Sequence, residues 1–360
     1  MKKFLNLNSI RSFADSLPPP TLIMLAVCAT LFNGCFSTGA RQTRIADEMP
    51  DAPRMDDTIY TQNYDPLNKN NRLVSIDAPT LKIDRKHPRV DGATALYPVY
   101  AAACRTIYTN VPESVFRSTW SGQRVHGLTK LVGVSTTPKA YERLVRGEVD
   151  VIFCAQPSPA QIAAAREKGI EFQLTPIGRE AFVFFVNEAN PVDGLTTAQI
   201  RAIYKKEITN WSEVGGREEK ILPFQRPADS GSQTAMEQQV MRGTPMATPL
   251  KEEQIRGMVG IVLATAAYRN APNAIGYSFR YFVTTMTGTK GIKLLKIDGV
   301  APTVETIRDG TYPYANNFYA ITTNKTANNP HVQELIAWFL SPQGQKLIDD
   351  TGYVSLGKTP

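Results

Sequence analysis

The sequence predicts an α/β fold of two lobes that are joined by two crossover strands, with a ligand cleft between the lobes. From residue 89 onward, segments typical of strands alternate with segments typical of helices. Residues 171–187 are long for one strand, and residues 182–186 within them are wholly apolar. We therefore expect this strand to leave one lobe and enter the other. Two such crossovers form a hinge, and the space between hinged lobes is the usual place for a ligand.

Strands and helices are expected in regular alternation along the body of the chain. Strands are expected at 89–90, 124–127, 149–154, 171–187, 221–225, 274–279 and 316–323, and helices between them, for example at 196–204 and 330–340. The return crossover that matches 171–187 is expected near 275–280. Helices at 332–340 and 342–350 are then expected to fold back on the first lobe.

The N-terminal segment has the features of an export signal. Lys2, Lys3 and Arg11 precede residues 21–32, which are apolar, uncharged and too short to span a bilayer. The segment closes with Leu31-Phe-Asn-Gly-Cys35, which resembles the lipobox of bacterial lipoproteins. We therefore expect lipidation at Cys35. Ordinary signal cleavage, with Cys35 incidental, is the alternative.

The expected domain organisation follows from these signals. Residues 1–34 are the lipoprotein signal peptide and residues 35–85 a polar tether with an N-terminal extension. Residues 86–178 form the first part of lobe I, 179–282 form lobe II, and 283–360 return to lobe I with the C-terminal helices.

Composition and charge narrow the class of ligand. A hydrophobic content of 42% and a charged content of 20% are typical of a soluble globular protein. The net charge of +7 becomes +5 once residues 1–34 are removed, because that segment holds three basic residues and one acidic residue. A basic exported protein suits an anionic ligand or surface. No basic stripe with interleaved aromatics is present, so we expect no nucleic-acid binding.

The sequence offers little support for an enzyme or a metal centre. His87, His126 and His331 lie far apart, and no Cys/His spacing is typical of a metal site. No nucleophile with an adjacent base is evident, so we expect neither catalysis nor a cofactor. Cys104 and Cys154 are either a disulfide in an exported protein or two small buried hydrophobes.

The most informative motif is Arg226-Pro-Ala-Asp-Ser-Gly-Ser-Gln-Thr234, which links an expected strand to an expected helix. The first N–H groups of a helix have no partner within it and carry the positive end of its dipole. Gly231 allows close backbone approach, Ser230 and Ser232 add hydroxyl donors, and Arg226 adds a planar cation. These residues predict an anion cradle.

The alternative is an ordinary capped helix, because Thr234-Ala-Met-Glu237 fits a capping box. Two further helix entrances carry hydroxyls, however. One contains Thr94 and leads to Pro98, and the other contains Thr137 as the expected N-cap before Pro138. Three such entrances together favour convergence on a single anion.

Several motifs resemble the phosphate-binding proteins of bacterial ABC phosphate importers, in that family's order between Val90 and Gly352. They are Asp91-Gly-Ala-Thr-Ala-Leu-Tyr-Pro98, Asn187-Glu-Ala-Asn-Pro191, Ile208-Thr-Asn-Trp-Ser-Glu-Val-Gly-Gly216, Gln225-Arg-Pro-Ala-Asp-Ser-Gly-Ser-Gln-Thr234 and Gly276-Tyr-Ser-Phe279. The resemblance implies a type II periplasmic-binding-protein-like fold that buries a dehydrated phosphate in a central interlobe cleft. It also implies a non-enzymatic monomer, periplasmic or at the cell surface, that serves an ABC permease in the inner membrane.

The resemblance also implies which residues bind the ligand. By position, the family's contacts fall on Thr94 and Ala95, on Thr136 or Thr137, and on Arg226, Ser230, Gly231 and Ser232.

The sequence departs from the family at one functional position. The family places an aspartate after the third strand, where it accepts a proton from phosphate, but Phe153-Cys-Ala-Gln-Pro157 holds no carboxylate. Asp229 stands where the family usually has glycine. It either replaces the missing acceptor or caps the helix.

The expected function is thus capture of phosphate or a related oxyanion by a membrane-anchored lipoprotein. The alternative is a surface or adhesion lipoprotein that kept the binding-protein fold without transport.

Overall fold

The structure is a computed structural model that describes residues 58–111, 131–267, 273–288 and 290–357. Residues Met55–Pro360 form one compact unit. The expected signal segment, the expected lipidation site Cys35 and the strand expected at 124–127 lie outside the described residues. Within the described ranges, no helix has the length and apolar character needed to cross a membrane.

One long strand organises the sheet of this unit. Strand β3 spans Phe172–Asn187, as the sequence predicts, and its two halves pair with different strands. Neighbouring strands of the sheet lie in the order β1, β2, β9, β3, β6, β5, and β7 also pairs with β3. Their bounds are β1 Val90–Gly92, β2 Val151–Cys154, β9 Ala315–Thr323, β6 Ala274–Phe279, β5 Leu222–Pro223 and β7 Ile292–Leu294.

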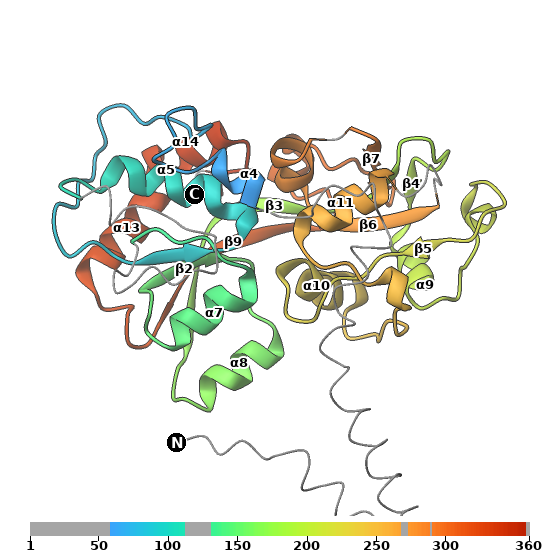
Figure 1. Cartoon of the computed structure of the whole chain (residues 1–360), viewed down its shortest axis with the longest axis horizontal. Coiled ribbons are helices and arrows are strands. Elements are labelled where there is room, and N and C mark those ends of the chain that lie inside the picture. The colour runs from blue at the N-terminus through green and yellow to red at the C-terminus, as the bar shows by residue number, and fades with distance from the viewer. Residues whose placement is uncertain (1–57, 112–130, 268–272, 289, 358–360) are drawn as a thin grey trace, which may run out of the picture. The chain divides into compact units, whose positions relative to one another are not determined.

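The division of β3 defines two lobes (Figure 1). Residues 172–181 pair antiparallel with β9, which continues to β2 and β1, and we call this side the first lobe. Residues 182–187 pair with β6 and β7, and we call this side the second lobe. The apolar run Phe182–Val186 is completely buried, which explains why it shows no alternation of polar and apolar residues. The predicted two-lobed α/β fold is confirmed.

Helices cover both faces of the first-lobe strands. In Figure 1, α5 and α14 lie on one side of β2, and α7 and α8 on the other. Each of these helices, and α13, has a proline in its first turn, where no N–H partner is needed. Their bounds are α5 Tyr97–Ile107, preceded by the 3-10 turn η1 Thr94–Leu96, α7 Thr137–Val145, α8 Pro159–Arg166, α13 Pro330–Leu340 and α14 Pro342–Thr351.

The second lobe adds shorter elements around the buried half of β3. Strands β4 (Gly194–Leu195) and β8 (Lys296–Ile297) form a separate two-stranded sheet. The helices are α9 Thr197–Tyr204, α10 Gly231–Ala235 continuing into the π-helical η3 Met236–Met241, α11 Met258–Ala267 and α12 Val304–Arg308. The short turns are η2 Trp211–Val214, η4 Lys251–Glu253 and η5 Phe282–Met286.

The expected return crossover near 275–280 is wrong. Strand β6 pairs with Phe182–Val186 of β3 and with β5, both in the second lobe, and the chain then turns back through η5 to β7. The strand that accompanies the first half of β3 is β9. Residues 292–297 group with the second lobe, because β7 pairs with the second half of β3 and β8 pairs with β4. Strands β4, β7 and β8 have only two or three residues, which is too few to show a pattern of alternation in the sequence.

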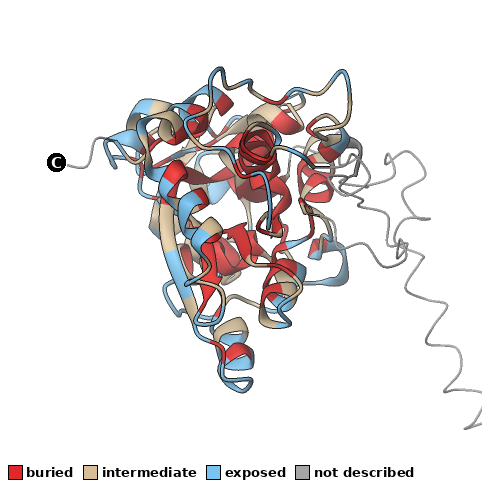
Figure 2. Ribbon diagram, turned by 90° about the vertical axis from the view of Figure 1, so that its left-hand side faces the viewer, coloured by how far each residue is buried: buried red, intermediate tan, exposed pale blue. Residues whose placement is uncertain are grey.

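The N-terminal extension packs on the first lobe from residue 58 onward. It contains α4 (Thr58–Gln62), and Tyr64, Leu73 and Ile83 are buried in the main core. Thr80 donates from its backbone N and its hydroxyl to Gln343 Oε1, at 2.9 and 3.0 Å. The same core continues between the helices and the sheet. Figure 2 shows its buried residues in red.

Candidate functional site

The three expected helix entrances all form, with corrections at two of them. The N-cap of α7 is Thr136, and Thr137 is the first helical residue, not the cap. The N-cap of α10 is Ser230, whose Oγ accepts from the backbone N of Gln233 at 3.3 Å. The capping box at Thr234 is therefore wrong, because Thr234 lies one turn inside the helix.

The second and third entrances touch each other. A Cβ atom at Gly231 would lie 2.9 Å from Thr137 Oγ1 and 3.7 Å from the ring of Phe279. Only glycine lets the start of α10 approach Thr137 this closely. Thr137 itself is 8% exposed, so its hydroxyl lies in a protected position between the lobes.

A cavity of about 30 Å³ lies at this junction. Its walls come from the loops of the first lobe and from the strands that cross between the lobes. The lining residues are Ala93, Ala95, Leu96, Thr137, Ala155, Glu180, Phe279, Asn316, Asn317, Phe318 and Tyr353. Ala95 belongs to the first entrance and Thr137 to the second, and Gly231 of the third lies against Thr137 and Phe279. The three entrances thus meet around one small cavity, with room for about two water-sized groups.

Other predicted site residues lie close by without lining the cavity. Thr94 is 2% exposed within η1, Ser232 is buried in the first turn of α10, and Thr136 is exposed at the α7 entrance. Arg226 Nη1 donates to the carbonyl oxygens of Ile255, at 3.1 Å, and Gly257. That nitrogen of the guanidinium is therefore held by the loop before α11.

Asp229 does not cap the helix, since Ser230 does. It has a left-handed backbone (φ 61°), which an aspartate tolerates. Its Oδ1 accepts from Ser158 Oγ at 2.6 Å, and its carbonyl oxygen accepts from Gln161 Nε2 at 3.3 Å. Ser158 is the N-cap of α8, so Asp229 joins the α10 entrance to the first lobe.

A second bridge lies beside the first. Gln238 Nε2, on η3, donates to the carbonyl oxygen of Pro157 at 3.3 Å, and Gln156 Nε2 donates to Gln238 Oε1. Residues 156–161 thus supply no carboxylate to the site. They supply hydrogen bonds that join the two lobes.

Buried Asp91 holds the first two entrances together. Its carboxylate accepts from the backbone N of Gly92 at 2.7 Å, from Ser135 Oγ at 3.0 Å and from Arg143 Nη1. Burial raises the pKa of Asp91, and the charge of Arg143 opposes that rise. Asp91 stands in the first family motif, but its neighbours in the sequence do not reveal this role.

Sequence reasoning also missed two cavity residues on crossing and returning segments. Glu180 is 5% exposed on β3, and burial raises its pKa to about 7. Tyr353, after α14, donates from its hydroxyl to the carbonyl oxygen of Ala95. No motif marks either residue, because their roles depend on where β3 and the C-terminal segment pass.

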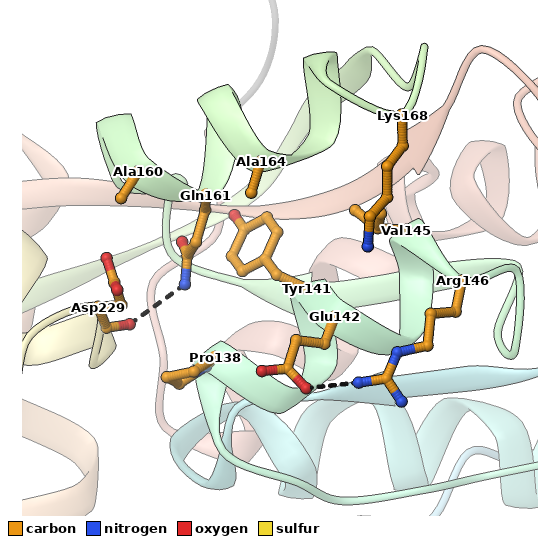
Figure 3. A pocket seen from close by; sticks show the side chains of 10 residues that line it. All are labelled: Pro138, Tyr141, Glu142, Val145, Arg146, Ala160, Gln161, Ala164, Lys168 and Asp229. Carbon is orange, nitrogen blue, oxygen red and sulfur yellow. Dashed lines mark hydrogen bonds and ion pairs between the residues drawn. The ribbon is translucent and has the colours of Figure 1, made fainter.

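A larger open groove of about 480 Å³ runs between α7 and α8 and ends at Asp229 (Figure 3). Tyr141, Val145, Ala160 and Ala164 supply its apolar surface. Its charged groups lie toward the rim, where Arg146 Nη2 binds Glu142 at 2.8 Å. Of the predicted site residues, only Asp229 lines this groove.

The two cysteines of the body are free thiols. Cys104 and Cys154 are both buried and do not form a disulfide with each other. They therefore act as small buried hydrophobes, the second of the two interpretations of the sequence. Burial raises the pKa of Cys104 to about 12, which keeps the thiol protonated. Among the residues that the structure describes, no group of three or more His, Cys, Asp or Glu side chains could hold a metal ion.

Comparison with known proteins identifies the family of this fold. The family model described as a PBP superfamily domain matches residues 85–343. The chain belongs to the PBP superfamily. Relatives of this PBP domain include the protein SphX of Synechococcus elongatus, 24% identical over 278 residues, or 74% of this chain and 76% of the relative. The phosphate-binding protein PstS of Bacillus subtilis is 26% identical over 200 residues, or 54% of this chain and 62% of the relative.

Solved structures agree on the fold. An ABC-type phosphate transport receptor from Vibrio cholerae has a TM-score of 0.51 and 19% identity, covering 74% of this chain and 98% of that one. A phosphate binding protein from Stenotrophomonas maltophilia has a TM-score of 0.51 and 13% identity, covering 75% and 91%. The resemblance to phosphate-binding proteins of ABC importers is confirmed.

Proposed function

We propose that this PBP-superfamily chain captures inorganic phosphate, or a related oxyanion, between its lobes for ABC-type import. The observation that carries the proposal is the convergence of three helix entrances on one cavity, with Thr137 against Gly231. Helix N-termini and hydroxyls supply the donors that a dehydrated anion requires, since a buried anion without hydrogen bonds is strongly destabilised. The chain binds and releases the anion without chemical conversion.

The residues divide into donors and a source of charge. The donors are hydroxyls and backbone N–H groups. They come from Thr94, Ala95 and Thr137, and from Ser230, Gly231 and Ser232 at the start of α10. Thr136 borders the site from the solvent side. Arg226 supplies positive potential beside α10, while its Nη1 fixes the neighbouring loop.

The named relatives support phosphate as the ligand, since PstS is named a phosphate-binding protein. The positive net charge of the chain favours the same class. Export and a lipid anchor at Cys35 would place the protein outside the cytoplasmic membrane, beside an inner-membrane permease. We expect it to act there as a monomer.

Isothermal titration of residues 35–360 against phosphate, sulfate, arsenate and molybdate tests the proposal. We expect phosphate to bind, and Thr137→Val to weaken its binding. Thr106→Val is the matched control, because its hydroxyl bonds to Ala102 O at 3.0 Å in the last turn of α5. Equal affinity in both variants would contradict the site.

A surface or adhesion lipoprotein without transport is the second candidate. The engagement of Arg226 Nη1 by two carbonyl oxygens favours it, because those donors are then directed away from an anion. Failure of all four oxyanions to bind, together with binding to intact cells, would support this candidate.

A further inference from the structure

Glu180 occupies the point where β3 passes from one lobe to the other. It pairs with Asn316 of β9, and Ala181 is the last residue of β3 that pairs with that strand. Two residues beyond Glu180, Phe182 begins the pairing with β6. The residue therefore lies in the hinge, and its side chain lines the interlobe cavity together with Asn316 and Phe279.

The carboxylate of Glu180 joins two hinge segments, its own strand β3 and the segment after β6. Its Oε1 accepts from the backbone N of Ala181 at 2.8 Å, and its Oε2 accepts from the backbone N of Tyr281 at 3.0 Å. Tyr281 follows β6, and its ring stacks on Tyr353 with centroids 4.3 Å apart. Tyr353 in turn donates to Ala95 O at the first helix entrance. A change at Glu180 thus acts on both a crossover and the cavity wall.

The groups around Glu180 leave its charge poorly balanced. Arg280, beside Tyr281 after β6, is the cation whose charge acts on it, and Arg280 Nη1 is directed at Gly352 O at 3.5 Å. The other titratable neighbours are Tyr281 and Tyr353, with Tyr64 of the N-terminal extension beyond Tyr281. Burial raises the pKa of Tyr281 and of Tyr353, so both phenols are neutral near pH 7. The backbone N–H groups stabilise the carboxylate, but burial outweighs them.

An anion that enters this cavity faces the carboxyl group of Glu180. Two negative charges in a water-poor space repel each other strongly, and a nearby like charge favours protonation of a carboxyl group. A protonated Glu180 removes the repulsion and gains an O–H donor toward the anion.

We propose that Glu180, in the hinge, takes up a proton when an anion enters the interlobe cavity, so that anion capture is coupled to protonation. This rests on the proposed function, because it assigns a proton-linked step to the same site. Since the pKa of Glu180 lies near 7 before binding, the coupling acts within the physiological range.

Phosphate titration at pH 6 and pH 8 tests the coupling, in buffers of different ionisation enthalpy that report proton uptake. In the unaltered chain, affinity is expected to fall from pH 6 to pH 8 by up to about tenfold more than in Glu180→Gln, with greater proton uptake at pH 8. Protonation of phosphate itself is common to both proteins and cancels. Glu207→Gln, at an exposed carboxylate paired with Lys205, should behave like the unaltered chain.

Equal pH profiles and proton counts in the unaltered chain and Glu180→Gln would overturn the inference while leaving phosphate binding established. If the unaltered chain binds no phosphate at any pH, the proposed function fails and the coupling fails with it.

A second measurement needs no variant and covers the case in which Glu180→Gln does not fold. The amide N–H of Tyr281 donates to the carboxylate, so its NMR shift should titrate with a midpoint near pH 7. Saturating phosphate should move that midpoint upward. A midpoint that phosphate leaves unchanged would overturn the inference.

Discussion

Asp229 Oδ1 accepts a hydrogen bond of 2.6 Å from Ser158 Oγ, and this bond joins the α10 entrance of the second lobe to the α8 cap of the first. The same Ser158 oxygen accepts from the backbone N of Gln161 at 3.1 Å. One hydroxyl therefore both caps a helix and links the lobes. A charge-assisted bond of this kind is stronger than a neutral one.

Asp229→Asn should weaken this link between the lobes while it leaves the α8 cap intact. We expect phosphate affinity to fall about fivefold to tenfold, because a neutral amide oxygen accepts the Ser158 bond roughly 1 kcal/mol more weakly than a carboxylate does. Small-angle scattering with and without phosphate, together with calorimetry, measures both effects. The ratio of phosphate affinity to sulfate affinity separates two roles of Asp229. A smaller ratio in the variant would make Asp229 an acceptor for the ligand, and an unaltered ratio would leave it an interlobe contact.

Arg226→Ala should weaken phosphate binding by about 30-fold or more, because it removes a cation beside the site and releases the loop at Ile255 and Gly257. Calorimetry measures the loss. Arg201→Ala is the control, since Arg201 Nε also donates to a carbonyl oxygen, that of Val240 at 2.6 Å. If both variants bind phosphate equally well, Arg226 is structural.

Gly231→Ala should reduce affinity, because its Cβ would lie 2.9 Å from Thr137 Oγ1 and force the entrances apart. A double-mutant cycle with Thr137→Ala isolates this contact. Thr137→Ala removes the oxygen that clashes, so Gly231→Ala should have a smaller effect in that background. Strict additivity of the two changes would show that the entrances do not touch.

Folding stability should decrease as the pH rises from about 4.5 to about 7 because of Glu180. Burial raises the pKa of this carboxyl from 4.5 to about 7. A group with a raised folded-state pKa stabilises fully below the unfolded-state value, near 4.5, and loses that contribution as the pH approaches 7. The loss is at most about 3 kcal/mol. Urea denaturation at pH 5 and pH 8 should show it, and Glu180→Gln should lack this component.

Arg143→Ala should destabilise the fold by about 3 kcal/mol, since it leaves the buried Asp91 carboxylate without its cation. Arg146→Ala is the matched control on the same helix, because Arg146 forms an exposed pair with Glu142. We expect that control to lose 1 kcal/mol or less. Denaturation curves give the free energy of unfolding of the two variants. Equal losses of this free energy would show that the Asp91–Arg143 pair has no structural role.

The sequence alone established the long strand, the helix entrances and the family. Strand β3 was evident because its wholly apolar half has no polar alternation, and the entrances because Ser, Thr, Gly and Pro favour helix starts for local reasons. These features depend on residues that are neighbours in the chain. Even there the cap of α7 was misplaced by one residue, because two adjacent threonines can both serve.

Only the tertiary structure decided which of these parts meet. The bond between Asp229 and Ser158 links residues 71 positions apart, and that between Glu180 and Tyr281 links residues 101 positions apart. No local propensity specifies such pairs, because they follow from where β3, β6 and β9 cross. For the same reason β9 was not recognised as the return strand, since a strand carries no local mark of the partner with which it pairs.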